Sequence, residues 1–269
     1  MSIRGLDEID MGYTLLSAFF VVGLFSAMLL LLEVGRRIGT RHMAVDPEGA
    51  KAGHGVVVGV VFSLLSLLLA FTFSGAASRF DARRQLAIQE FNALSKAYYV
   101  VNLFPQPVQA KLKNSFRDYV DAELQAIKAL PDEHAAELAY SRASAVKLDI
   151  QNQVIAVCQD PSSQALGAYV LLPAVNDWIA NSTNRVAATN THPPVAIYAV
   201  LVGLALMSSW IAGYAMAEAK ARNWLHVVGF AAVVTVIIYF IIDLELPRVG
   251  LIRVTDTDRL LVELRNKMG

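Results

Sequence analysis

The sequence predicts an all-α membrane protein with four transmembrane helices, arranged as two hairpins with a helical insert between spans two and three. Two observations lead to this fold class. Hydrophobic residues make up 55% of the 269 residues and charged residues only 17%, whereas soluble domains average about 45–50% and about 25%. The apolar residues also gather in four long blocks without Asp, Glu, Lys or Arg. Such blocks are typical of helices that cross a bilayer.

The four predicted spans are residues 13–32, 55–77, 194–217 and 225–242. Each approaches or exceeds the roughly 18–20 residues that cross the hydrocarbon core. The first block is too long for the apolar region of a signal peptide, which is about 7–15 residues, and the tail before it is acidic rather than basic. We therefore expect the first block to be a retained span. The short connections at 34–54 and 218–224 predict one hairpin on each side of the insert.

The insert, residues 79–192, is predicted to be helical throughout. Apolar residues at spacings of three and four predict its first helix over residues 83–104, and few residues separate that helix from the second span. One continuous rod is therefore expected. Proline-containing segments then separate three further helices, and Pro173 is expected to kink or begin the last of them.

Four parts follow along the chain: a tail and hairpin at 1–78, the insert at 79–192, a second hairpin at 193–246 and a C-terminal tail at 247–269. The tail is expected to hold a short extended stretch at 249–254 and a final amphipathic helix. An even number of spans places both termini and the insert on one side. Basic residues in the first connection favour an external insert, whereas those after the second and fourth spans favour the opposite. Charge therefore leaves the side open.

No catalytic or metal-binding pattern occurs in the sequence. The five histidines are scattered, the single cysteine cannot build a thiolate site, and no phosphate-binding glycine loop or serine elbow is present. The 23 basic and 23 acidic residues balance, without the basic patch of a nucleic-acid-binding protein. We therefore expect no catalytic residue, metal, cofactor or nucleic-acid partner. Hydroxyl side chains in the spans either bond to a backbone carbonyl, favoured for Ser208 and Ser209, or line a pore.

The most specific pattern is LLSLLLAF at residues 64–71, followed by RFDARR at residues 79–84. It resembles the second membrane helix of bacterial bestrophins. The wider pattern is similar to the bestrophin-like domain family of bacterial membrane proteins, which has no assigned function. The motif residues that carry this resemblance over nearly the whole chain are Asp81, Glu90, Asn92, Asn176, Pro247, Arg248, Gly250 and Arg253.

Bestrophins are pentameric anion channels, and some bacterial members conduct cations. The resemblance implies a multi-pass protein of the bacterial inner membrane with a cytosolic insert and a central pore lined by the second span. Its apolar neck falls on Ser63, Leu67 and Phe71, although Ser63 departs from the usual large apolar residue. These positions are four residues apart and share one helix face.

Arg79, Arg83 and Arg84 follow the second span and admit two interpretations. They anchor the helix end at the interface, or they form a vestibule that concentrates anions. Asp81 offsets part of this charge, so either small anions or small cations fit.

Three functions remain open from the sequence. The leading one is a homo-oligomeric, bestrophin-like ion channel whose partners are the lipid bilayer, copies of itself and small ions. The second is a non-conducting scaffold or sensor that acts through its helical insert. A membrane enzyme ranks last, because the sequence holds no acid, base, nucleophile or metal cluster.

Overall fold

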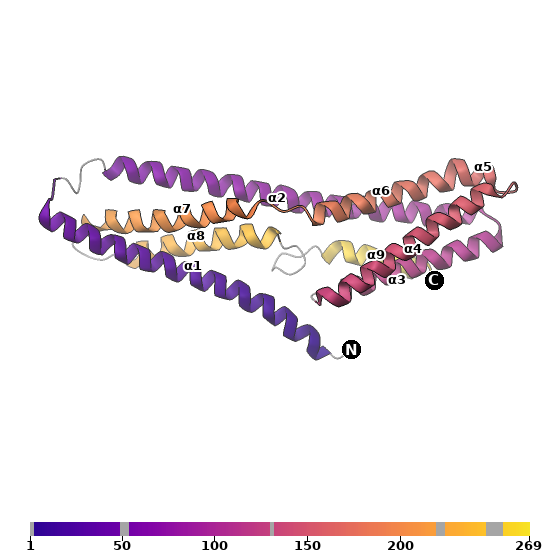
Figure 1. The fold of residues 1–269 in the computed structure, drawn as a ribbon, viewed down its shortest axis with the longest axis horizontal. Helices are drawn as coiled ribbons and strands as arrows, with labels where there is room; N and C mark the ends of the chain where they lie inside the picture. The colour runs from indigo at the N-terminus through magenta and orange to yellow at the C-terminus, as the bar shows by residue number, and fades with distance from the viewer. Residues whose placement is uncertain (1–2, 49–53, 130–131, 219–223, 246–254) are drawn as a thin grey trace. The chain divides into compact units, whose positions relative to one another are not determined.

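The computed structural model describes residues 3–48, 54–129, 132–218, 224–245 and 255–269, and within them every regular element is helical (Figure 1). The chain forms two compact units. The span unit holds Met11–Ser78 and His192–Leu246, and the insert unit holds Met1–Asp10, Arg79–Thr191 and Pro247–Gly269. The predicted extended stretch at 249–254 lies outside the described residues.

Four of the described helices are long and apolar enough to cross a membrane, as the sequence predicts. They are α1 (Ile3–Val45), α2 (His54–Val100), α7 (Val195–Ala215) and α8 (Trp224–Glu245). Helix α1 continues well beyond the predicted end of the first span at Leu32. Its charged extension is supported by Arg37, whose Nε donates to Glu33 Oε1, one turn earlier, at 2.8 Å.

Helix α2 is the continuous rod that the sequence predicts. Its 47 residues correspond to about 70 Å at 1.5 Å per residue. The hydrocarbon core needs only about 30 Å. A 3₁₀ turn, η1 (Val101–Leu103), follows α2, and Pro105 comes before the next helix.

Helices α1 and α7 pack backbone to backbone in the span unit. A Cβ atom added at Gly35 would lie 2.0 Å from the Trp210 carbonyl oxygen, and one added at Gly213 would lie 2.0 Å from the Leu32 carbonyl oxygen. A Cβ atom added at Gly39, one turn beyond Gly35, would lie 2.8 Å from the Tyr214 carbonyl oxygen of α7. This Gly-x-x-x-Gly spacing lets two membrane helices approach closely. The apolar pattern alone did not predict the contact.

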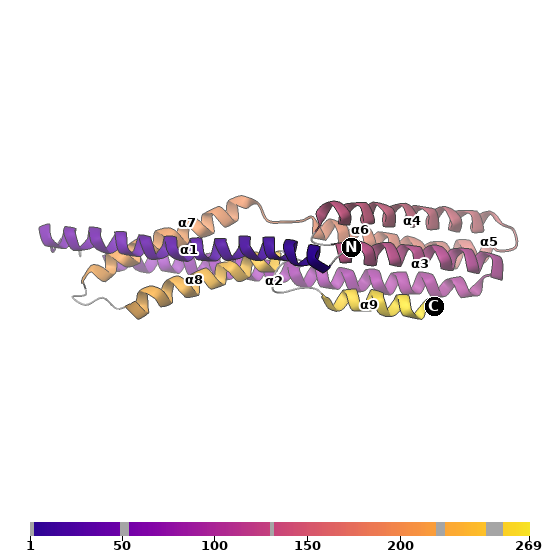
Figure 2. The ribbon, with the colours of Figure 1, turned by 90° about the horizontal axis from the view of Figure 1, so that it is seen from below.

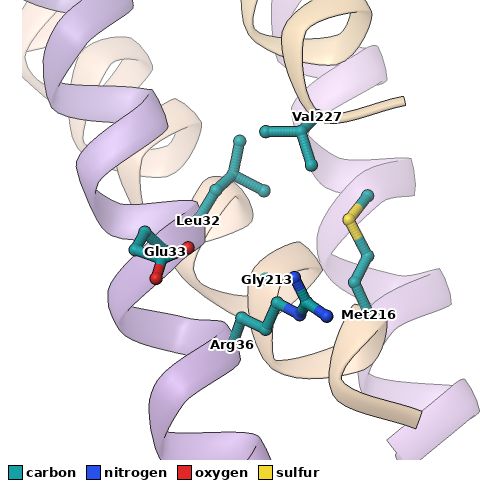
Figure 3. Close-up of a pocket in the computed structure, with 6 residues that line it drawn as sticks. All are labelled: Leu32, Glu33, Arg36, Gly213, Met216 and Val227. Atoms are coloured by element: carbon teal, nitrogen blue, oxygen red, sulfur yellow. The ribbon is translucent and has the colours of Figure 1, made fainter. Parts of the chain in front are cut away.

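A small pocket lies beside this close crossing (Figure 3). It is lined by Leu32, Glu33, Arg36, Gly213, Met216 and Val227. One turn beyond Gly39, His42 Nδ1 lies 2.6 Å from the Tyr214 hydroxyl. The two rings meet edge to face with their centroids 6.2 Å apart. A polar contact therefore continues the α1–α7 interface past the glycines.

The other contacts of the span unit are largely apolar. Phe62 of α2 and Phe230 of α8 have ring centroids 5.3 Å apart. Ser208 and Ser209 are buried, and each donates its hydroxyl to a carbonyl one turn earlier in α7, at 2.7 and 2.9 Å. The prediction that these two hydroxyls pack rather than line a pore is confirmed.

The insert unit is a helical bundle (Figure 2). Besides the part of α2 from Arg79 onward, it contains α3 (Gln106–Ala129), α4 (Glu133–Gln159), α5 (Gln164–Leu166), α6 (Leu172–Thr189) and α9 (Thr255–Lys267). Its core is aromatic at the centre, where Tyr119 and Phe116 of α3 lie 4.7 and 5.5 Å, ring to ring, from Trp178 of α6. The predicted helices and their order are confirmed.

Turn residues mark the predicted breaks between these helices. The Asp132 side chain caps α4 by accepting a hydrogen bond from the backbone N–H of Ala135 at 3.1 Å. A π-helical turn, η2 (Gly167–Leu171), joins α5 to α6. Pro173 directly follows this π-helical turn, and the backbone is helical on both sides of it, so its missing N–H falls beside the widened turn. The predicted kink or boundary at Pro173 corresponds to this change from π- to α-helical geometry rather than to the start of a separate helix.

Candidate functional site

The exposed face of α2 carries the three residues predicted for a pore neck. Ser63, Leu67 and Phe71 are all exposed, with exposed fractions of 53% for Leu67 and 68% for Phe71. Of the 18 consecutive residues that are most apolar in α2, only 11% are buried, against 22%, 28% and 33% in the other three spans. The apolar segment of α2 is therefore the least buried of the four.

An open groove runs along the first turns of this face. Its lining comes entirely from α2: Gly55, Val56, Gly59, Val60, Ser63, Leu64 and Leu67. A Cβ atom added at Gly55 or Gly59 would meet nothing within 4 Å. These glycines therefore hollow the helix surface, and Leu67 and Phe71 follow as bulkier residues. The predicted neck residues are thus neighbours on one accessible face.

The charged residues that follow the second span have different environments. Arg84 and Asp81 are exposed, and Arg79 is half-buried. Arg83 is buried, and its guanidinium donates from Nε to the carbonyl oxygen of Ala188 at 3.2 Å and from Nη2 to that of Thr191 at 3.0 Å. These acceptors lie at and beyond the end of α6, where unpaired carbonyls favour a cation. The vestibule role of the three arginines stays a prediction.

Glu90, a motif residue, belongs to a buried ion-pair cluster inside the insert unit. Arg185 of α6 reaches between two carboxylates, with Nε donating to Glu90 Oε2 of α2 and Nη2 donating to Glu123 Oε2 of α3 at 3.1 Å. The hydroxyl of Tyr119 lies 3.2 Å from Glu90 Oε1 and 3.3 Å from Glu123 Oε1. Three helices are therefore joined through one guanidinium.

A second cation, Lys147 of α4, stands at the edge of this cluster. Its Nζ donates to the Ser182 hydroxyl and lies 5.5 Å from the centre of the Tyr119 ring and 6.0 Å from that of Trp178. An ammonium over aromatic faces is stabilised by their negative π surface. All four long helices of the bundle thus contribute a charged residue to its centre.

The pKa values of the cluster follow from burial and charge. Burial raises the pKa of the Tyr119 hydroxyl well above its usual value, and the nearby carboxylates of Glu123 and Glu90 add to this. Burial also lowers the pKa of Lys147. Burial opposes the charge on Arg185 as well, but Glu90 and Glu123 outweigh it and raise the pKa of Arg185. The guanidinium therefore stays charged inside the bundle.

The remaining motif residues are less enclosed or are not described. Asn92 and Asn176 are exposed. Asp177, next to Asn176, lies 4.0 Å from Lys96 Nζ in an exposed ion pair. The predicted motif residues after the last span, Pro247, Arg248, Gly250 and Arg253, lie outside the described residues.

A family model, the Bestrophin-like domain, matches residues 22–258 of this chain. The chain belongs to the bestrophin-like family. Its fold agrees with that assignment, because it superposes on a crystal structure of a point mutant of a bacterial bestrophin homologue from Klebsiella pneumoniae with a TM-score of 0.62. The superposition covers 89% of this chain and 98% of the other at 13% identity, so it supports a common fold. No curated protein matches the sequence.

Bestrophin-like membership and the four long apolar helices make this a multi-pass membrane protein. The family resemblance and the motif containing Glu90 were visible in the sequence. The partner of Glu90 was not, because Arg185 is 95 residues away and lies in a helix of ordinary composition. The spacing of Val175, Trp178 and Ser182, all buried, was the available signal that Arg185 would also face inward.

Proposed function

We propose that this bestrophin-like chain is one subunit of a homo-oligomeric ion channel in the bacterial inner membrane, a pentamer by family resemblance. In this proposal α2 lines a central pore and the insert lies in the cytoplasm. The observation that carries it is the exposed apolar face of α2, which a single chain leaves uncovered. Identical copies of the chain arranged around an axis would cover this face of α2 and enclose a pathway for ions between them.

The proposed neck combines two chemistries. Leu67 and Phe71, exposed on successive turns, would form apolar rings that resist the passage of hydrated ions and gate by losing water. Ser63 would place a ring of hydroxyls before them, beside a groove widened by Gly55 and Gly59. A hydroxyl ring offers hydrogen bonds to water without selecting the sign of the ion.

Selectivity in this proposal depends on the charges after the neck. The exposed Arg84 would attract small anions, whereas the exposed Asp81 would attract small cations. Arg83, which already binds carbonyls at the end of α6, would instead hold the insert against α2. The four predicted parts would then be two membrane hairpins, a cytoplasmic insert at 79–192 and the tail at 247–269.

Replacing Phe71 by Ala is expected to raise the unitary conductance several-fold, because a large ring is removed from each subunit at the narrowest apolar level. Single-channel recording in planar bilayers measures this change. Phe73→Ala is the matched control, since Phe73 is also exposed, at 45%, but lies about 200° around the helix from Phe71. Conductance of the control should match that of the native protein.

The alternative function, a non-conducting scaffold or sensor acting through the insert, makes the opposite prediction. Protein that is oligomeric in nanodiscs, yet passes neither anions nor cations in liposome flux and bilayer recordings, would rule out the channel. If Phe71→Ala and Phe73→Ala changed the unitary conductance equally, the protein would still be a channel, but the face of α2 that carries Phe71 would not be its neck.

A further inference from the structure

Helix α4 of the insert unit has two apolar faces. Its inner face packs on the bundle through the buried Ala143, Ile150 and Val154. Its outer face also bears large apolar side chains, with Leu138 and Leu148 each 59% exposed and Ile155 43% exposed. A helix that packs on only one side has no need of the second face.

The outer face follows a heptad repeat. When Leu138 is counted as position a, the a and d residues from there to Ile155 share one face of the helix. All six are exposed: Leu138, Ser141, Ala145, Leu148, Asn152 and Ile155. A period of 3.5 residues is the pattern of a helix that pairs with another helix along its length. We call these six residues the α4 seam.

Charges beside the seam specify a partner. Glu137 occupies position g and Arg142 occupies the following position e, and both are exposed. Neither takes part in an ion pair within the part of the chain that the structure describes. In a parallel pair of helices, a g residue meets the e residue five positions later in its partner. Glu137 therefore complements Arg142 of a second, parallel copy of α4.

We propose that the α4 seam binds the α4 seam of a second copy of this chain as a parallel two-stranded coiled coil. Leu138, Leu148 and Ile155 form its apolar layers, and two symmetric Glu137–Arg142 pairs flank it. Asn152 meets Asn152 of the partner subunit, a polar a-position layer that favours one register and two strands. In an antiparallel pair this amide would instead oppose position 141.

This contact is modest in strength and is independent of the proposed pore. The α4 seam, from Leu138 to Ile155, extends over only about 26 Å, and Ser141, Ala145 and Asn152 reduce its apolar content. Confinement of two chains in one bilayer raises their effective concentration and favours such a weak pairing. Each chain has a single α4 seam, so the contact joins chains in pairs. In a ring built around α2 it would connect one ring to the next.

Disulfide trapping in native membranes tests the pairing. With Cys158 replaced by Ser, Leu148→Cys should form a covalent dimer upon mild oxidation, because d residues of parallel helices face each other. Asn184→Cys, at an exposed position on α6, is the collision control and should form much less dimer. An equal dimer yield at both positions would overturn the proposal. So would a mixed dimer of Ala145→Cys and Leu148→Cys chains that exceeds the Leu148→Cys dimer, since that result indicates antiparallel helices.

Charge reversal tests the predicted partner residues. Glu137→Arg in the Leu148→Cys protein should lower the dimer yield roughly fivefold, the size expected when two exposed ion pairs become repulsions. Adding Arg142→Glu should restore the yield, because the pair is rebuilt with exchanged signs. A loss that the second substitution does not rescue would reject the Glu137–Arg142 contact. Ion flux measured on the same preparations reports on the proposed channel separately.

Discussion

Replacing Gly35 by Ala is expected to destabilise the span unit by about 3 kcal/mol or more, the upper range for overpacking a close contact. The added methyl group would lie 2.0 Å from the Trp210 carbonyl oxygen and 2.9 Å from the Tyr214 nitrogen. Both neighbours are backbone atoms, so no side-chain rotation relieves the collision and α1 must move away from α7. The thermal midpoint of the detergent-solubilised protein, followed by size-exclusion chromatography after heating, measures the loss.

Two matched substitutions distinguish the effect of the steric clash from the effect of replacing a helical glycine by alanine. Gly23→Ala and Gly203→Ala lie on the same helices, α1 and α7, at positions where a Cβ atom meets nothing within 4 Å. Alanine is the better helix former by about 1 kcal/mol, so both controls should keep or gain stability. If Gly35→Ala were as stable as these controls, the close α1–α7 packing would be wrong. Gly213→Ala is expected to behave like Gly35→Ala, because it meets the Leu32 carbonyl oxygen at 2.0 Å.

Replacing Arg185 by Ala is expected to destabilise the insert unit by about 3–5 kcal/mol, the cost of leaving buried charges without their partner. The carboxylates of Glu90 and Glu123 are only 9% and 6% exposed and would then repel each other. Arg265→Ala is the control, because the two hydrogen bonds from Arg265 to the half-exposed Asp121 are in contact with solvent and should contribute about 1 kcal/mol, less than the buried cluster. Hydrogen exchange of α3 peptides, analysed by mass spectrometry, measures both effects.

Neutralising the two acids should reverse much of this loss. In Arg185→Ala combined with Glu90→Gln and Glu123→Gln, no buried charge remains at these three positions, so protection of α3 should recover substantially. A triple variant as unstable as the single one would indicate that Arg185 acts through packing rather than charge. An effect of Arg185→Ala no larger than that of Arg265→Ala would contradict the buried pairing itself.

Much of the fold could be predicted, because it depends on local patterns. Long apolar blocks identify the four spans, proline residues divide the insert helices, and the three-and-four spacing extends α2 into the insert. The length of α1 was underestimated. Its apolar block ends at Leu32, but ion pairing one turn apart, as between Glu33 and Arg37, supports a helix that is no longer apolar.

Contacts between segments that are distant in the sequence were harder to predict. The spacing of Gly35 and Gly39 is visible, but only the structure identifies the α7 carbonyl that Gly35 approaches. The likeness to bestrophins pointed to Ser63, Leu67 and Phe71, and their exposure is compatible with a neck. The same likeness placed Arg83 with Arg79 and Arg84 in one predicted vestibule, whereas Arg83 is buried against the end of α6. Neighbours in a motif can face different surroundings, because each residue turns about 100° from the last.

The π-helical turn at Gly167–Leu171 has a consequence for how this chain tolerates length changes. A π turn spaces its hydrogen bonds one residue further apart than an α turn does, so it accommodates one residue more. That residue sets the angular phase of everything that follows in α6. If the turn became α-helical without the loss of a residue, Trp178 and Arg185 would rotate by about 100°, taking one out of the aromatic centre and the other away from Glu90. Deletion of one residue inside η2 should therefore be tolerated, because the turn can revert to α geometry, whereas deletion of one residue between η2 and Trp178 should disrupt both contacts.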